Sequence, residues 1–230
     1  MKDPRKKLIS GSIFRTLHFF LQLTVAFIMT PLVIRGLGED QYGLWILILA
    51  VFGIGSMMDF GLSSGLARYI SRAIGTEDTE DILTHFNTGF FIYCAIGFVA
   101  LLLSCAGSLI CYLVIQEQQL AKLVATVVAV LGLNLTLRFL TLAFRGILTA
   151  HLRYDFYSIA ASIGLVLANL GIFWLISRGS GIHGIAAIVL AASVIESLAV
   201  VVFAKITFPR LRISLAQFDD AARSRLLGYG

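Results

Sequence analysis

The feature that most constrains the fold is a run of 26 residues, 90–115, that contains no charge. A helix needs about 20 consecutive apolar residues to cross the hydrocarbon core of a bilayer, so this run is long enough to span it. Five further apolar stretches approach the same length. The six predicted spans have their apolar cores at residues 17–34, from 42 onwards, 90–115, 123–144, 158–176 and 185–204. We therefore predict an all-α, polytopic membrane protein with six transmembrane helices.

The composition agrees with a chain that lies mostly in the bilayer. Hydrophobic residues make up 58% of the sequence, charged residues make up 13%, and the mean hydropathy is +0.91. Soluble domains carry about 25% charged residues. The net charge of +5 does not indicate nucleic-acid binding, because the basic residues separate the apolar runs instead of forming one patch. We expect the lipid bilayer as a partner and no nucleic acid.

The basic residues also predict the orientation of the chain. With the N-terminus in the cytoplasm, 13 of the 18 Lys and Arg residues fall on the cytoplasmic side, 3 fall on the opposite side, and Arg15 and Arg138 lie in or beside spans. Short cytoplasmic loops of membrane proteins carry an excess of Lys and Arg. The bias predicts a cytoplasmic N-terminus, an even number of crossings and a cytoplasmic tail.

The second apolar stretch is unusual because glycines and a carboxylate interrupt it. As one continuous helix, residues 42–72 would be about 46 Å long, whereas the hydrocarbon core of a bilayer is about 30 Å thick. The segment must therefore tilt, break or leave the membrane early. Asp59 lies within it, and Gly61 and Gly65 are the natural places for a bend.

Three sequence segments resemble a known family. LGEDQYGLW at 37–45 and DFGLSSGLARYIS at 59–71 resemble the first loop and second helix of bacterial Wzx-like polysaccharide flippases. FRGILTAHLRYD at 144–155 is similar to their connection between helices four and five, with Phe144 in place of a leucine. These flippases belong to the MOP superfamily, together with the multidrug/toxin extrusion (MATE) transporters and the lipid II flippases.

The resemblance implies the N-terminal half of a two-lobe transporter. Residues 1–208 would form a six-helix lobe, and residues 209–230 a cytoplasmic inter-lobe linker and the start of a seventh helix, so the chain would be a fragment. The implied function is the movement of undecaprenyl-diphosphate-linked oligosaccharide across the bacterial inner membrane by alternating access. Such transport serves the biosynthesis of cell-surface polysaccharide such as lipopolysaccharide O-antigen, and other polysaccharide-assembly proteins are candidate partners.

Two alternatives stand beside the flippase. A MATE-type multidrug antiporter moves mostly cationic compounds, and an acidic cavity would be expected for it. Here Arg outnumbers carboxylate within the spans, which favours the flippase. A membrane polymerase or glycosyltransferase of the same pathway would need a large loop with catalytic groups. The sequence contains no paired-His metal motif, nucleophile elbow or P-loop, so we expect no enzyme activity, catalytic residue, metal or cofactor.

Polar side chains within the spans are the candidate site residues, because ionisable groups are costly in the membrane and usually face protein or water. Helical spacing puts Asn134, Arg138, Thr141 and Arg145 on one face, and likewise Arg15, His18 and Gln22. Arginine offers a fork of donors that suits a diphosphate. The predicted lining of a cationic cavity consists of Arg138, Arg15, Arg68, Arg145, Asn134 and Gln22, and the predicted coupling or ion-pair residues are Asp59, Glu196 and His18.

Each candidate also has a structural interpretation. Arg68 and Arg145 fit positive-inside anchors, and Arg15 fits a side chain that reaches lipid phosphates. Asp59 fits a partner of a nearby arginine, and Glu196 fits either a partner of Arg138 or a coupling group. The same residue types also fit simple contacts between helices, an interpretation that applies to His18 and to the Ser and Asn residues.

Overall fold

The computed structural model describes residues 4–55, 59 and 61–227. These residues form eight α-helices and one short 3-10 helix, and no strand occurs among them, which confirms the all-α prediction. The elements in chain order are α1 (Pro4–Leu37), α2 (Glu39–Gly55), α3 (Leu62–Gly75), α4 (Thr79–Val114), α5 (Gln118–Ala150), α6 (Tyr154–Ser177), α7 (Ile182–Thr207), η2 (Leu215–Gln217) and α8 (Asp220–Leu227).

Five of the helices are long and apolar enough to cross a membrane, namely α1, α4, α5, α6 and α7. They contain the first, third, fourth, fifth and sixth predicted spans. The second predicted span is divided into α2, of 17 residues, and α3, of 14 residues. Gly61 directly precedes α3 with a φ of 78°, in the left-handed region that glycine adopts readily. The predicted break is therefore present at one of the two glycines expected to allow it.

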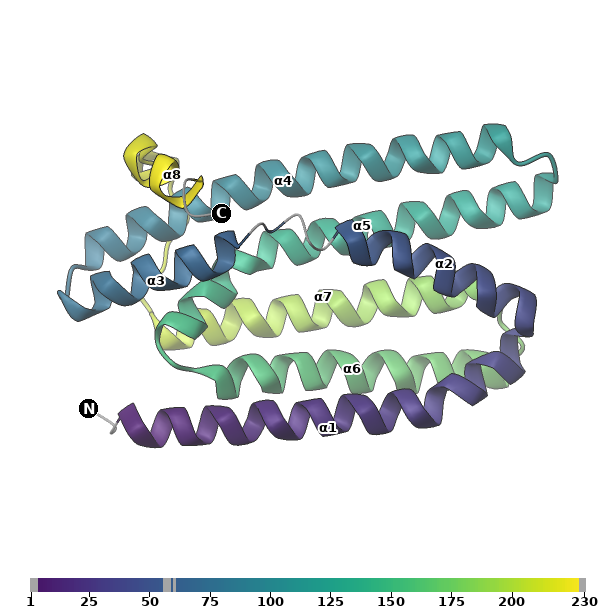
Figure 1. The fold of residues 1–230 in the computed structure, drawn as a ribbon, viewed down its shortest axis with the longest axis horizontal. Coiled ribbons are helices and arrows are strands. Elements are labelled where there is room, and N and C mark those ends of the chain that lie inside the picture. The colour runs from purple at the N-terminus through teal and green to yellow at the C-terminus, as the bar shows by residue number, and fades with distance from the viewer. Residues whose placement is uncertain (1–3, 56–58, 60, 228–230) are drawn as a thin grey trace.

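The long helices lie side by side, in the spatial order α1, α6, α7, α5 and α4 (Figure 1). Helix α3 packs against α4 and α5, whereas α2 makes fewer contacts with the rest of the bundle. One apolar core gathers around Phe86, Phe139 and Ile147 between α3, α4 and α5. A second core, around Trp45 and Ile185, lies between α2, α5 and α7.

The connections alternate between the two ends of the bundle. The N-terminal end of α1, the turns at 76–78 and 151–153, and the segment after α7 lie at one end, on the left in Figure 1. We call this the basic end, because most of the Lys and Arg residues outside the spans fall there. The other end holds the connections at 38, 115–117 and 178–181. With α2 and α3 counted together, the chain passes along the bundle six times, but only five helices of the described chain are long and apolar enough to cross a membrane by themselves. The six crossings and the assignment of the basic end to the cytoplasm stay predictions.

Candidate functional site

The structure brings two of the predicted site residues into direct contact. Arg145, on α5, donates a hydrogen bond from Nη2 to Oε1 of Glu196, on α7, at 2.8 Å. The two side chains are 20% and 15% exposed. A charge within a membrane span is costly unless it is paired, so each of these groups neutralises the other.

Helix α6 completes the surroundings of this ion pair. The guanidinium of Arg145 lies 5.2 Å from the centre of the Tyr157 ring, a favourable position for a cation over an aromatic face. Gly164 lies against the carboxylate, since a Cβ atom there would be 2.8 Å from Oε2 of Glu196. Nε of Arg145 is buried and has no hydrogen-bond partner within the described part of the chain. The pair thus sits where α5, α6 and α7 meet.

A second polar contact joins α5 to α7. The side-chain amide of Asn134 donates to Oγ of Ser193 at 2.6 Å and to the carbonyl of Val189 at 3.4 Å. Asn134 and Ser193 are both buried. The amide of Asn134 therefore bonds between the two helices, and its predicted part in lining a cavity stays a prediction.

Arg138 lies on α5 with its side chain exposed, and the described residues offer it no partner. Glu196 pairs with Arg145, so the predicted alternative of an Arg138–Glu196 pair is wrong. The reason is geometric. Side chains on a helix lean towards its N-terminus, so Arg145 reaches back to the level of Glu196.

The other predicted cavity residues also lie at the surface. Arg15 and Gln22 are exposed on α1, and Arg68 is exposed on α3. The structure thus brings Arg145 to a carboxylate, and it places the remaining three arginines on exposed faces of three different helices. Their role as a shared cationic lining stays a prediction.

Asp59 is held by hydroxyl groups and a backbone amide. Its carboxylate accepts hydrogen bonds from Oγ of Ser63 at 2.6 Å, from the backbone N–H of Ser63 at 3.2 Å and from the hydroxyl of Tyr93 at 2.8 Å. The arginine partner that we predicted does not appear among these bonds. The contact ties the break between α2 and α3 to α4. Our sequence reasoning missed Tyr93, although a buried tyrosine needs a hydrogen-bond partner for its hydroxyl.

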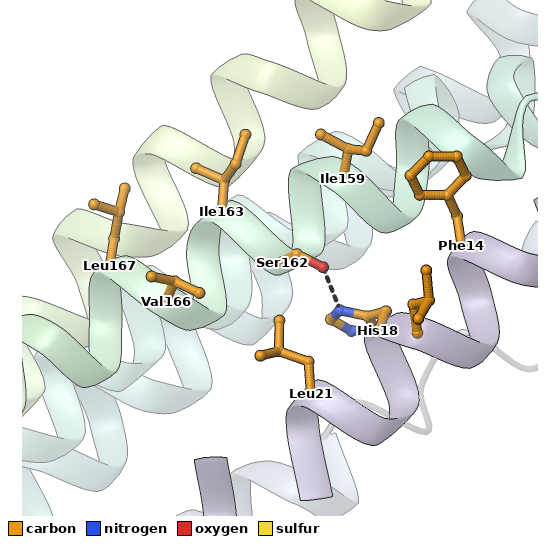
Figure 2. Close-up of a pocket in the computed structure, with 9 residues that line it drawn as sticks. Phe14, His18, Leu21, Ile159, Ser162, Ile163, Val166 and Leu167 are labelled. Atoms are coloured by element: carbon orange, nitrogen blue, oxygen red, sulfur yellow. Dashed lines mark hydrogen bonds between the residues drawn. The ribbon is translucent and has the colours of Figure 1, made fainter. Parts of the chain in front are cut away.

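His18 lies at a groove between α1 and α6. Nδ1 of His18 is 2.9 Å from Oγ of Ser162, and Figure 2 shows this pair surrounded by aliphatic and aromatic side chains of the two helices. The groove has a volume of about 640 Å³. Its lining is almost entirely apolar, with Phe14, Leu17, Leu21, Ile159, Ile163, Val166 and Leu167 beside the polar pair. Several of these lining side chains are exposed, among them Phe14 and Leu17, so the groove is open along its length.

The residues with described positions contain no group of three or more His, Cys, Asp or Glu side chains that could hold a metal ion. What the bundle offers is one ion pair between helices, a mostly apolar groove and exposed arginines.

Comparison with known proteins decides the family. The family model MatE matches residues 16–175, which is more than half of the chain. The chain belongs to the MatE family. A search of curated proteins found no match.

A solved structure extends the similarity to the fold. It is described as the outward-facing conformation of a multidrug resistance MATE family transporter of the MOP superfamily. The TM-score is 0.78 at 20% sequence identity, and the match covers 98% of this chain and 51% of that protein. The chain thus spans about half the length of the transporter and has the fold of one half of it. The predicted MATE/MOP-type half-transporter fold is confirmed, whereas a Wzx-like flippase within the superfamily has no support from these comparisons.

Proposed function

We propose that this MatE protein forms part of a cation-coupled exporter of organic compounds, the function that we first considered as an alternative to the flippase. The single observation that supports this most is the match of nearly the whole chain to half of a multidrug resistance transporter. The apolar groove between α1 and α6 suits compounds with a large apolar surface. The proposed location is the bacterial inner membrane, with the N-terminus in the cytoplasm.

Glu196 is the proposed coupling group. It is a carboxylate in a membrane-spanning helix, and Arg145 is its partner at 2.8 Å. A proton or metal cation that binds Glu196 competes with Arg145 for the same oxygens. The binding of a coupling ion would therefore release the contact between α5 and α7, and two states of this contact provide the two conformations that coupled transport requires.

The second candidate is the flippase for undecaprenyl-diphosphate-linked oligosaccharide. The observation in its favour is Arg138, an exposed arginine in a predicted span. A guanidinium facing lipid at the centre of a span costs several kcal/mol, so an anionic substrate would account for its position. Arg15 and Arg68 are further exposed arginines that suit an anion.

One pair of assays separates the two functions. The complete protein is expressed in bacteria without their own exporters, and the accumulation of a fluorescent organic cation is measured. It is also expressed in a strain without its polysaccharide flippase, and surface polysaccharide is measured. We expect reduced accumulation of the cation and no restored polysaccharide.

Variants sharpen the comparison. For an exporter, efflux per amount of inserted protein should be lost in Glu196→Gln, whereas Arg138→Ala should keep it. For a flippase, Arg138→Ala should abolish polysaccharide export. Arg138→Lys keeps the positive charge but loses the paired N–H donors of the guanidinium, so it should retain only part of the activity. Restored polysaccharide with no effect on the cation would overturn the first proposal in favour of the second.

A further inference from the structure

The chain does not leave the bundle after α7. Residues 208–219, which we call the strap, turn back over the basic end, and η2 lies within this segment. Both η2 and α8 contact α4, and α8 also contacts α3. Figure 1 shows α8 beside α4, whereas α6 lies on the opposite side of α5. The strap is therefore docked on helices that lie more than 100 residues before it in the sequence.

Asn87 on α4 holds the strap through its side chain. Oδ1 accepts a hydrogen bond from the backbone N–H of Ser214 at 2.8 Å, and Nδ2 donates to the carbonyl of Arg212 at 3.2 Å and to Oε1 of Gln217 at 3.0 Å. Nδ2 also donates to the carbonyl of Leu83 in its own helix. Asn87 is 0% exposed. A buried amide is costly unless its donors and acceptors are used, and here the strap uses most of them.

Thr88, the next residue of α4, adds a second polar contact. Its Oγ1 accepts from the backbone N–H of Asp219 at 3.2 Å, and Thr88 is also fully buried. Apolar contacts surround the two residues. Leu211 of the strap and Leu226 of α8 are buried in the same core as the α3–α4–α5 side chains. The docked segment thus has an apolar anchor on each side of its polar contacts.

The contacts at the outer edge of the strap are weaker. Gln217 donates to Glu80 at 2.9 Å, and Arg212 lies 3.7 Å from the same carboxylate, with both charged side chains largely exposed. Exposed ion pairs contribute little to stability. The buried side chains of Asn87 and Thr88 therefore dominate the polar part of the docking.

The position of the strap has a mechanical consequence. Helix α4 packs mainly on α5 and α3, whereas α7 packs mainly on α5 and α6. We propose that the strap clamps the end of α7 to α4 through Asn87 and Thr88, and to α3 through the following helix α8, so that the basic end of the bundle moves as one unit. This inference rests on the fold and does not depend on the identity of the transported compound.

Limited digestion with trypsin tests the docking, because Arg210 and Arg212 are exposed in the strap. The purified full chain in detergent is digested, and cleavage after these two residues is followed by mass spectrometry. Cleavage tracks the fraction of detached strap when opening is fast. The two hydrogens of Nδ2 are shared by three acceptors, one of them in α4 itself, so Asn87→Ala loses the equivalent of about two hydrogen bonds to the strap and should be cleaved about 30-fold faster. Thr88→Val loses one and should be cleaved about 5-fold faster.

Asn169→Ala is the matched control. Asn169 lies in α6 and donates to the carbonyl of Leu165 in its own helix, so this variant loses an amide without touching the strap. We expect cleavage of the strap at the wild-type rate. If Asn87→Ala does not fold, Thr88→Val decides by itself. The docking would be overturned if both α4 variants were cleaved in the strap at the wild-type rate. It would also be overturned if trypsin cleaved the strap of the folded wild-type protein as fast as that of the urea-denatured chain.

Hydrogen exchange tests the clamp in the same samples. When Asn87→Ala releases the strap, amides in the first turns of α4 and at the end of α3 should also exchange at least about 10-fold faster, because the clamp stabilises these ends against local opening. Release of the strap with unchanged exchange in α3 and α4 would show that it is docked but clamps nothing.

Discussion

Removal of Arg145 should destabilise the protein strongly, because it leaves the carboxylate of Glu196 without its partner. The two side chains are 20% and 15% exposed, so most of each is away from water. Gly164 lets α6 approach the carboxylate closely, since a Cβ atom there would lie 2.8 Å from Oε2. The perturbation is Arg145→Ala, which deletes the guanidinium and retains the helix.

The magnitude follows from the burial of the pair. Breaking a buried ion pair by removing one partner costs about 3–5 kcal/mol, and the residual exposure here favours the lower end, about 3 kcal/mol. For a chain of this length, 1 kcal/mol shifts the melting temperature by about 2–4 °C. Arg145→Ala should therefore lower Tm by about 6–12 °C.

The assay is thermal unfolding of the purified protein in detergent, followed by intrinsic fluorescence. Arg138→Ala is the control, since it removes an exposed arginine from the same helix without breaking an ion pair, and it should not lower Tm. Glu196→Gln tests the cause of the loss. The double variant should recover about 2 kcal/mol relative to additivity, because no unpaired carboxylate remains.

Two results would refute this reasoning. Equal Tm values for the Arg145→Ala and Arg138→Ala proteins would mean that the ion pair contributes nothing to the fold. Strict additivity of the Arg145→Ala and Glu196→Gln effects would mean that the two side chains do not interact in the membrane protein.

Three further predictions concern packing and topology. Gly164→Ala should lower the free energy of unfolding, followed by Tm, by about 1–3 kcal/mol, because the new Cβ would lie 2.8 Å from Oε2 of Glu196. Gly43→Ala is the control and should not lower it, since a Cβ there meets nothing within 4 Å. Equal effects of the two substitutions would contradict the close contact. Tyr93→Phe should cost about 1–2 kcal/mol by Tm, because Asp59 loses a hydroxyl donor; an unchanged Tm would contradict this. Reporter fusions should read cytoplasmic after residues 72, 153 and 212 and periplasmic after 39, 118 and 180, and a periplasmic reading after 212 would overturn the topology.

The long helices could be predicted from the sequence because the bilayer dictates their length and apolar character. The run at 90–115 lies almost entirely within α4, and the glycine at 61 marks the break before α3. These features depend on local composition and on backbone freedom, both of which a sequence displays directly.

The partners of the polar residues could not be predicted in the same way. Arg138 and Arg145 are seven positions apart, so helical periodicity places them on the same side of α5 and cannot choose between them. Which of the two arginines pairs with Glu196 depends on how far α7 is shifted along its axis relative to α5, and on the direction in which the arginine side chain leans. The contact of Asn87 with the strap joins residues 125 or more positions apart, and its only sequence signal is an amide at the start of an apolar run.

The most direct test of the proposed function is transport by the complete purified protein in liposomes. A fluorescent organic cation is placed on one side, and a proton or sodium gradient is imposed across the membrane. We expect the cation to move against its own gradient. This movement should stop when an ionophore collapses the driving gradient, and it should be absent in Glu196→Gln. Absence of gradient-driven movement in liposomes that do translocate a polyprenyl-diphosphate glycan would contradict it.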